Sequence, residues 1–214
     1  MKKYFLIIFF LFSLIKPFDT SKMLMIFFTR TGNTGLFANY INETLNIETY
    51  QIIPVTPYTT DLDEMLDIAR EERNNNVRPE IKGPLIDISK YDAILLGYPL
   101  WHSYLPNIVI NLLEHLNLEG KIIYPFNTYG TLGVGNSIED IKNYAHGAIV
   151  KEGFPISDSM IKIKSESMIK IEQWINNNFT NPSKSINSDE MNLNNAKIFK
   201  INFYILYICA IFFI

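Results

Sequence analysis

Short apolar runs alternate with amphipathic segments from residue 23 to residue 179, and no other feature restricts the fold of this chain as much. The first run, 23–28, reads Met-Leu-Met-Ile-Phe-Phe and contains no polar residue, as a strand buried on both faces requires. Residues 33–45 then repeat apolar side chains at helical spacing. Strands that alternate with helices form a parallel sheet with helices on both faces. We therefore predict an α/β fold with three layers and a doubly wound, five-stranded parallel sheet.

The remaining elements continue this alternation. Further strands are expected at 48–53, 93–97, 121–126 and 148–150, the last with 154–156 as a further piece. Helices are expected at 60–74, with Thr60 or Asp61 as its cap, and at 106–116, 137–144 and 158–179. Ligands of an open parallel sheet bind at the carboxyl ends of the strands, where the strand order reverses. The loops that follow the strands are therefore the place to look for a site.

The loop after the first strand, Thr29-Arg30-Thr31-Gly32-Asn33-Thr34, has the composition of an anion-binding turn. The first N–H groups of the next helix lack intrahelical partners, and the peptide dipoles place partial positive charge there. Threonine hydroxyls add donors, and Gly32 lets the backbone curl around an anion. The Gly-Lys-Ser/Thr ending of a nucleoside-triphosphate loop is missing. We expect a phosphate monoester here; the alternative is a helix that is simply capped by a hydroxyl residue.

Two further loops are unusual in composition. The loop 98–106, after the third strand, carries tyrosine, tryptophan and histidine side chains and is stiffened by prolines. The loop 127–135, after the fourth strand, is rich in glycine and hydroxyl side chains. Aromatic residues in loops, unlike those in strands, need a functional reason. An anion-binding turn that faces aromatic side chains and backbone donors indicates a pocket for a phosphorylated flat ring.

The composition excludes several classes of function. The formal net charge of -3 leaves no basic stripe that could neutralise phosphates, so we expect no nucleic-acid partner. Cys209 is the single cysteine, which rules out an intrachain disulfide and a thiolate metal site. His102, His115 and His146 show no metal-ligand spacing. No metal site is therefore predicted.

Both ends of the chain differ from its middle, for which we expect one domain over 22–180. In residues 1–21, Lys2 and Lys3 precede an apolar segment, as in a secretory signal peptide or a membrane anchor. Residues 181–197 form a polar spacer, and 198–214 form a hydrophobic tail. A spacer followed by such a tail is typical of a glycolipid-anchor signal, and a C-terminal tail anchor is the competing interpretation.

These ends predict a protein of the secretory pathway that is attached to the membrane or extracellular. The sequons Asn42-Glu43-Thr44 and Asn178-Phe179-Thr180 favour export slightly, although an asparagine-rich chain produces such triplets by chance. The alternative location is the cytoplasm, where most NAD(P)H is found and where a simple tail anchor would leave the domain.

The three loops together resemble those of the flavodoxin-like FMN-binding proteins. The resemblance rests on Thr29-x-Thr31-Gly32-x-Thr34, on Gly97-Tyr98-Pro99-Leu100-Trp101 and on the glycine-rich loop 127–135, each after an expected strand. It covers nearly all of residues 23–179. The subfamily that the chain most resembles has Arg-Thr-Gly-Asn-Thr in the first loop and an extra helical segment before Arg78-Pro79-Glu80. The resemblance implies a five-stranded sheet and tight, non-covalent binding of FMN.

The resemblance also implies roles for individual residues. The phosphate would be held by residues of the first loop: Thr29, Thr31, Gly32, Asn33 and Thr34. Arg30 either pairs with the phosphate or points to solvent. The isoalloxazine ring would be framed by two groups of residues: Pro99, Leu100, Trp101 and His102, and Thr128, Tyr129 and Gly130. Trp101 is the first candidate for ring stacking and Tyr129 the second; the alternative for Trp101 is a side chain buried beneath its loop.

The chain departs from the family pattern at His102 and Ser103, which stand in place of an aromatic residue and a glycine. A glycine would let the peptide turn toward the reduced flavin nitrogen. Its absence puts one-electron chemistry in doubt and favours two-electron transfer. His102 is a candidate donor of a proton or hydrogen bond to a substrate, and the alternative is a solvated loop histidine.

Three functions remain compatible with the sequence. The first is an FMN-dependent redox protein that exchanges electrons with a partner protein or a small acceptor. The second is an NAD(P)H-dependent, FMN-containing quinone or nitro-compound reductase, and the third is a flavin-free binding module on the same fold. A receiver-type signalling domain is excluded, because Phe28 and Gly97 stand where such a domain requires carboxylates. No catalytic residue is assigned.

Overall fold

The computed structural model describes residues 19–130 and 135–180. Their parallel sheet has the strand order β2-β1-β3-β4-β5, and β6 also pairs with β4. The strands are β1 (Met23–Phe28), β2 (Glu48–Ile52), β3 (Ala93–Pro99), β4 (Ile122–Tyr129), β5 (Ile149–Val150) and β6 (Phe154–Ser157). The helices are α2 (Asn33–Leu45), α3 (Leu62–Asn74), α4 (Asn107–His115), α5 (Ser137–Tyr144) and α6 (Lys164–Ile175), with 3-10 turns at Thr20–Lys22 (η1) and Met160–Lys162 (η2). The predicted α/β fold is confirmed.

The edge strand beyond β4 consists of two pieces. β5 pairs with Ile122 and Ile123 near the start of β4, and β6 pairs with the residues from Phe126 to Tyr129. Both pairings are parallel, so β5 and β6 act as one fifth strand that is interrupted at residues 151–153. This agrees with the expectation that 154–156 adds a piece to the fifth strand.

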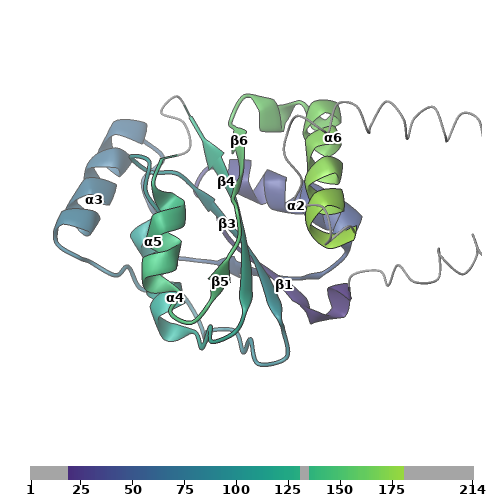
Figure 1. The fold of residues 1–214 in the computed structure, drawn as a ribbon. Helices are drawn as coiled ribbons and strands as arrows, with labels where there is room; N and C mark the ends of the chain where they lie inside the picture. The colour runs from purple at the N-terminus through teal and green to yellow at the C-terminus, as the bar shows by residue number, and fades with distance from the viewer. Residues whose placement is uncertain (1–18, 131–134, 181–214) are drawn as a thin grey trace, which may run out of the picture. The chain divides into compact units, whose positions relative to one another are not determined.

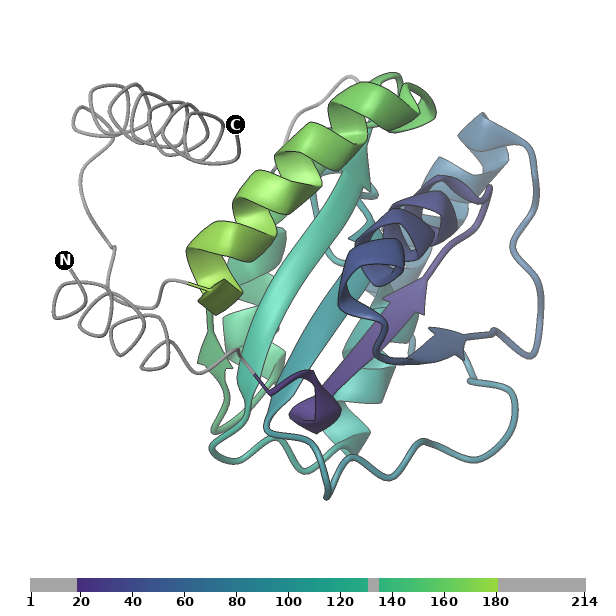
Figure 2. The same cartoon turned by 90° about the vertical axis from the view of Figure 1, so that its right-hand side faces the viewer.

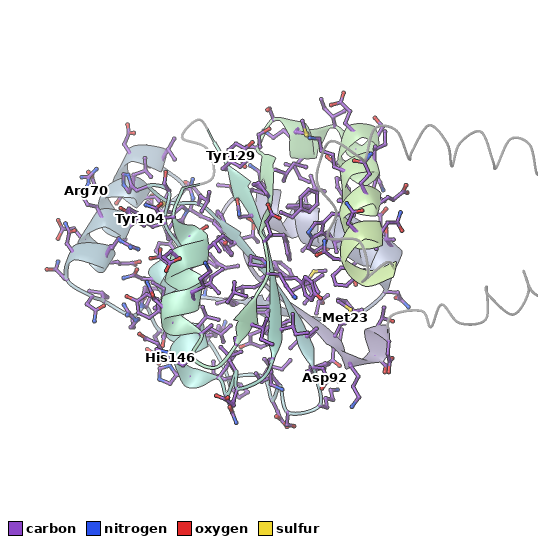
Figure 3. The ribbon with its side chains drawn as sticks, in the orientation of Figure 1. Met23, Arg70, Asp92, Tyr104, Tyr129 and His146 are labelled. Atoms are coloured by element: carbon purple, nitrogen blue, oxygen red, sulfur yellow. The ribbon has the colours of Figure 1, made fainter. Side chains whose placement is uncertain are left out.

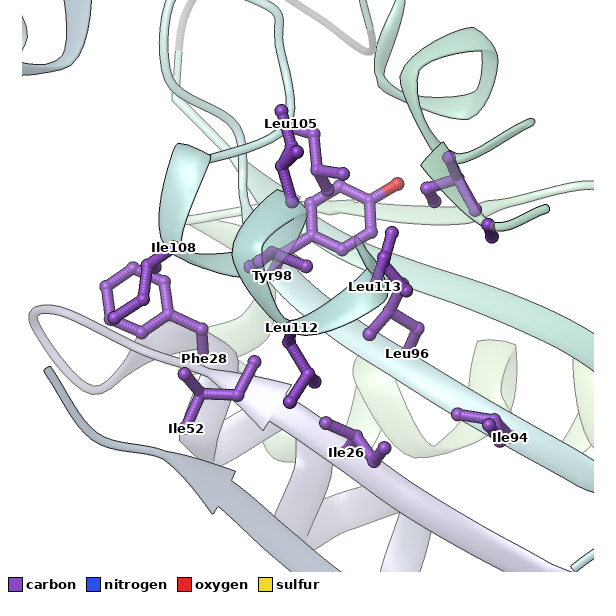
Figure 4. Packing of buried hydrophobic residues seen from close by; sticks show 14 of the residues in the cluster. Ile26, Phe28, Ile52, Ile94, Leu96, Tyr98, Leu105, Ile108, Leu112 and Leu113 are labelled. Atoms are coloured by element: carbon purple, nitrogen blue, oxygen red, sulfur yellow. The ribbon is translucent and has the colours of Figure 1, made fainter. Parts of the chain in front are cut away.

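Helices cover both faces of the sheet (Figures 1 and 2). α2 and α6 lie side by side on one face, and α3, α4 and α5 lie on the other. The central strands β1 and β3 are buried over nearly their whole length, which explains their unbroken apolar sequences. Figure 4 shows part of the core on the α4 side, where Phe28, Tyr98 and Leu112 belong to one buried cluster. This packing fixes the strand ends from which the first two loops emerge.

Gly97 in β3 has no room for a side chain. A Cβ atom there would collide with the Phe126 ring of β4 and would lie 2.9 Å from Phe27 Cβ in β1. The Phe126 ring occupies the space above the glycine and meets the ring of Phe37 in α2 edge-on, with centroids 5.1 Å apart. The glycine therefore permits the aromatic contacts that hold α2 against the sheet.

The structure extends two strands beyond their predicted ends. β3 continues to Pro99 and β4 to Tyr129, because Tyr98 pairs with Asn127 and Pro99 with Thr128 in the parallel ladder. Several residues expected in loops therefore belong to the sheet. Asp61 caps α3 as expected, since its side chain accepts a hydrogen bond from the Glu64 N–H.

The last helix begins later and ends earlier than predicted. The Ser157 hydroxyl accepts a hydrogen bond from the Met160 N–H, which stabilises a tight turn before η2, and α6 starts only at Lys164. After Ile175 a separate compact unit begins, and its described part is a π-helical turn over Asn176–Thr180. The π turn explains why helical periodicity continues to residue 179 in the sequence.

The expectations for the chain ends fall almost entirely outside the described residues. This holds for 1–21, of which only 19–21 are described, and for 181–197 and 198–214. Within 19–130 and 135–180, no helix has the length and apolar character that a membrane span requires.

Candidate functional site

The candidate site lies at the carboxyl edge of the sheet, around the loops that follow β1, β3 and β4. The strand order reverses at β1, since β2 lies on one side of it and β3 on the other. Figure 3 shows Tyr104 and Tyr129 at this edge and Met23, Asp92 and His146 at the opposite one. The loops and α3 line a pocket of about 210 Å³.

The loop after β1 presents an uncapped helix end. Gly32 is the N-cap residue of α2, has a φ of 96° and makes no side-chain hydrogen bond to the first turn. Among residues 19–130 and 135–180, no side chain caps the first N–H groups of α2, so these groups can bind an external acceptor. The Thr29 hydroxyl accepts a hydrogen bond of 3.1 Å from the Gly32 N–H, which closes the turn. The proton of that hydroxyl can still be donated to a ligand.

A buried pair of hydroxyls joins this loop to β4. Thr34 Oγ1 and Thr128 Oγ1 are 2.8 Å apart, and the two residues are 1% and 2% exposed. One hydroxyl donates to the other, so the pair retains one proton that it can offer to a third group. The first turn of α2 is thereby tied to the strand end that leads to Tyr129 and Gly130.

Arg30 connects the first loop to the start of α3. Its Nη1 donates to the backbone carbonyls of Thr59, Thr60 and Asp61 at 2.9, 3.1 and 3.4 Å. The side chain also lines the pocket, so its positive charge lies at the site while one nitrogen is held by the backbone.

The loop after β3 begins with a two-residue hairpin, Trp101 to Tyr104, which we call the hairpin. Trp101 and Tyr104 exchange two backbone hydrogen bonds, of 3.2 and 2.9 Å. The residues between them, His102 and Ser103, have φ values of 49° and 69°. Positive φ at both central positions indicates a type I′ turn, which is usually made by asparagine and glycine. Neither is present here.

Two contacts hold the centre of the hairpin. His102 Nε2 lies 2.8 Å from the carbonyl oxygen of Leu66 in α3. A carbonyl can only accept, so Nε2 carries a proton and is not a free base. The Ser103 carbonyl accepts a hydrogen bond of 2.8 Å from the Asn136 N–H. The His102 ring is therefore anchored to α3, although its side chain is only half-buried.

Trp101 lies mostly inside the core, with 5% of its surface exposed. Its ring meets Phe28 edge-on, with centroids 5.5 Å apart, and Tyr58 at 4.7 Å. The part that remains accessible lines the pocket. Trp101 thus supports the pocket wall from below, as in the alternative raised from the sequence. Tyr129 is only half-buried at the same pocket.

Tyr58, which contacts the Trp101 ring, is hydrogen-bonded to a buried carboxylic acid, Glu72. The Tyr58 hydroxyl donates to Glu72 Oε2 at 3.1 Å, and Glu72 is 9% exposed. Burial raises the pKa of Glu72, and the bond from Tyr58 offsets part of that shift. Burial also raises the pKa of Tyr58, and the negative charge of Glu72 raises it further. Glu72 lines a second pocket, of about 360 Å³, which shares Trp101 and His102 with the first.

The first pocket contains nearly all the predicted residues. It is lined by twelve of the residues singled out from the sequence: Thr29, Arg30, Thr31, Asn33, Thr34, Pro99, Leu100, Trp101, His102, Thr128, Tyr129 and Gly130. Gly32 does not line it but shapes the loop through its positive φ. Residues 131–134 of the third loop lie outside the described residues.

Sequence reasoning missed other residues of the pocket. Leu62, Met65 and Leu66 come from α3, whose apolar face is equally consistent with ordinary core packing. Ser103 was noted only as a departure from the family pattern. Asp158 follows β6, where its N–H donates to the Tyr129 carbonyl at 2.9 Å, and a single aspartate in a turn carries no recognisable pattern.

The pocket lining combines two chemical types. Hydroxyls, the end of α2 and one guanidinium come from the loops after β1 and β4, apolar side chains come from α3 and the second loop, and Asp158 adds one carboxylate. Such donors suit an anion, and an apolar wall suits a flat ring. In the described ranges, no three His, Cys, Asp or Glu side chains come together as a metal site would require.

Comparison with known proteins agrees with this arrangement. The chain is similar to a proposed flavoprotein of Bacteroides uniformis, with 24% identity over 72% of this chain and 97% of that one and a TM-score of 0.62, which supports the fold. It is 29% identical to a proposed flavoprotein of Bacteroides eggerthii over 70% of this chain and 98% of that one, with a TM-score of 0.58. A Lactobacillus acidophilus flavoprotein solved in complex with FMN is 26% identical over 68% and 99%, with a TM-score of 0.54. No curated protein matches the chain.

The model of the flavodoxin family matches residues 22–178, which include all described strands and helices from β1 to α6. The strand order, the uncapped turn after β1 and the solved relatives agree with that match. The chain therefore belongs to the flavodoxin family.

Proposed function

We propose that this chain is a redox protein that binds FMN non-covalently in the pocket at the carboxyl edge of the sheet. The observation that carries the proposal is the junction of an uncapped, hydroxyl-rich helix end with an apolar wall in one pocket. Further support comes from the Lactobacillus acidophilus flavoprotein, a relative whose structure contains FMN.

The phosphate of FMN would bind at the first turn of α2. The hydroxyls of Thr29, Thr31 and Thr34 and the side chain of Asn33 supply neutral donors at that end of the helix. The helix dipole adds favourable partial charge, so neither a lysine nor a metal is needed. The Arg30 charge adds to this potential.

The flavin ring would lie against the second and third loops. Pro99, Leu100 and Tyr129 offer partly exposed surface there, while Trp101 backs the wall and α3 closes it with apolar side chains. When bound, FMN supplies the ability to accept and release electrons. The chain contributes binding, orientation and a largely apolar environment for the ring. Electrons would pass to a partner protein or to a small acceptor.

A second function, NAD(P)H-dependent reduction of a quinone or nitro compound, is favoured by the hairpin. A type II′ turn, which differs from type I′ by rotation of the central peptide, normally has glycine at its first central position. That position is His102 in this chain, whose ring is bonded to α3, and Ser103, which stands in place of the family's glycine, is the second central residue. Without the rotation, the hairpin cannot offer a new backbone hydrogen bond to a one-electron form of the flavin.

The visible absorption spectrum of the purified chain tests the proposal. Bound FMN should give two bands that bleach on anaerobic reduction with dithionite. Thr31→Ala should lower the affinity for FMN but not for riboflavin, which lacks the phosphate. The matched control is Thr44→Ala, because Thr44 is exposed at the other end of α2. A colourless chain that does not take up added FMN would contradict the proposal and favour the flavin-free binding module.

Turnover measurements separate the two redox functions. A reductase should oxidise NAD(P)H in the presence of a quinone, whereas an electron carrier should do so only after a separate reductase is added. Anaerobic titration complements this assay, because a carrier accumulates a one-electron form and a two-electron reductase converts directly between oxidised and fully reduced spectra.

We also propose that the protein acts in the secretory pathway, attached to a membrane or extracellular. This rests on the apolar character of 1–21 and 198–214 and on the spacer 181–197. A mobility shift after glycosidase treatment is the expected result. Recovery from the cytosol with both ends intact would contradict it.

A further inference from the structure

The hairpin is held in a conformation that its own sequence does not favour. His102 and Ser103 both have positive φ, which is unfavourable for residues that carry a Cβ atom. Trp101 and His102 line both pockets, so the hairpin is a wall that the two pockets share. Trp101 is packed in the core, but the other three residues of the hairpin are only half-buried and border the pockets, so they have fewer packing contacts than a core segment has. Specific contacts must therefore hold the hairpin in place.

An ion pair between α3 and α5 supplies such contacts. The guanidinium of Arg73 lies over the Tyr104 ring, with Cζ 3.6 Å from the ring centroid. Its Nη1 and Nη2 donate to Asp140 Oδ2 and Oδ1 at 3.1 and 3.0 Å. Asp140 Oδ2 also accepts a hydrogen bond of 3.1 Å from the Leu105 N–H. One ion pair thus contacts the last side chain of the hairpin and the backbone that follows it.

The geometry of the pair makes it rigid. Asp140 is 6% exposed, so its carboxylate depends on protein partners for its hydrogen bonds. A two-pronged arginine–carboxylate pair fixes the orientation of both groups, and a lysine cannot reproduce the fork or its flat stacking on a ring. Neither Arg73 nor Asp140 lines the first pocket, so neither is placed to contact a ligand there.

We propose that the Arg73–Asp140 pair positions the hairpin against the flavin and so sets the affinity and the spectrum of bound FMN without touching it. The inference rests on the proposed function, because it takes the first pocket to be the FMN site. The effect passes through Tyr104 and Leu105, which connect the pair to the hairpin. Arg73 and Asp140 are accordingly positioning residues and not catalytic ones.

The chain contains a matched control for this pair. Arg78 forms a fork with Glu114, Nε to Oε2 at 2.7 Å and Nη2 to Oε1 at 2.8 Å, and its Cζ lies 5.3 Å from the centroid of the Tyr144 ring. This second cluster therefore contains the same three chemical groups as the first: a guanidinium, a carboxylate and a tyrosine ring. None of these three residues lines either pocket, so loss of this fork should not reach the hairpin.

The test compares Arg73→Lys with Arg78→Lys in the full-length chain, with urea unfolding to show that both variants fold. Both substitutions keep the charge, so a difference between them reports geometry. Arg73→Lys should weaken FMN binding roughly tenfold and shift the visible flavin band. In the flavin-free protein it should also speed hydrogen exchange at the Tyr104 and Leu105 amides roughly tenfold. Arg78→Lys should change none of these quantities.

Two results would overturn the inference. One is an equal change, or no change, in both lysine variants; the other is faster exchange at the hairpin with unaltered FMN affinity and spectrum. If Arg73→Lys does not fold, Asp140→Asn replaces it, since asparagine can still accept from the Leu105 N–H but cannot form the charged fork. A wild-type chain that binds no FMN would instead refute the proposed function, and the exchange rates would then decide whether the pair holds the hairpin.

Discussion

The hydroxyl pair of Thr34 and Thr128 allows a quantitative test of the site. The two residues are 1% and 2% exposed, and their Oγ1 atoms are 2.8 Å apart. Valine has nearly the shape of threonine but no hydroxyl, so each single valine removes the partner of a buried hydroxyl. Leaving such a group unsatisfied costs about 1–3 kcal/mol. We expect Thr34→Val and Thr128→Val each to lower the free energy of unfolding of the flavin-free chain by about 2 kcal/mol.

The double variant should lose less than the sum of the single losses. With both hydroxyls replaced by methyl groups no polar atom of the pair is left without a partner, and such a paired replacement is nearly neutral. A coupling energy of about 1 kcal/mol or more between the two positions is therefore expected. Urea unfolding of the wild type, both single variants and the double variant, followed by circular dichroism without FMN, measures it. Strictly additive losses would refute the hydrogen bond between the hydroxyls.

The same variants test the role of Thr34 in binding. A hydrogen bond to a charged group contributes about 1.5–3 kcal/mol, so loss of the Thr34 hydroxyl should weaken FMN binding at least roughly tenfold. Riboflavin carries no phosphate, and its affinity should change little. Equal losses for FMN and riboflavin would show that Thr34 acts on the ring side or on the fold, and not on the phosphate.

Three further outcomes follow from the structure. Gly97→Ala should destabilise the fold by about 2–3 kcal/mol in urea unfolding, because the new Cβ collides with Phe126; an unchanged midpoint would show that the sheet yields there. Burial raises the pKa of Glu72 above its ordinary value of 4.5. Between pH 4.5 and the raised pKa, the folded protein therefore keeps a proton that the unfolded chain releases. The free energy of unfolding consequently falls as the pH rises through this range. Glu72→Gln should flatten this decline, and parallel stability curves for the two proteins would contradict the assignment. In Gly32→Ala, the new Cβ atom meets no other atom within 4 Å, but the residue must keep a φ of 96°, which is unfavourable for alanine. This substitution should weaken FMN binding by about tenfold and leave riboflavin binding unchanged. Equal affinities of Gly32→Ala and the wild type for FMN would refute this.

The position of the site could be predicted from local sequence, because each loop follows an apolar run. A run such as 23–28 can be buried on both faces only in a covered parallel sheet, and this places the loop after it at the carboxyl edge. The exact strand ends could not be predicted in this way. Tyr98 and Tyr129 belong to strands because their neighbours pair in register across β3, β4 and β6, and that pairing is not visible in one segment.

The hairpin could not be predicted for a different reason. Local sequence indicates a type I′ turn when asparagine and glycine occupy its centre, and His102 and Ser103 give no such signal. Tertiary contacts select the turn here, with Leu66 accepting from the His102 ring and Asn136 donating to the Ser103 carbonyl. For Trp101, the sequence left two alternatives because an aromatic residue in a loop can face a ligand or the core. Its contacts with Phe28 and Tyr58 exist only in the folded chain.

The hairpin also links the fold to the choice between one-electron and two-electron chemistry. Rotation of the peptide between His102 and Ser103 would convert the type I′ turn into a type II′ turn, which normally requires glycine at the position of His102. Both turn types keep the two backbone hydrogen bonds between Trp101 and Tyr104, so the obstacle to the rotation is the Cβ atom of His102, whose ring is also bonded to the Leu66 carbonyl. Without that rotation, the hairpin cannot offer a new backbone hydrogen bond to one particular reduction state of a bound flavin. Among the functions proposed for this chain, the side chain at position 102 therefore supports the two-electron reductase, and accumulation of a one-electron form in the anaerobic titration would contradict this.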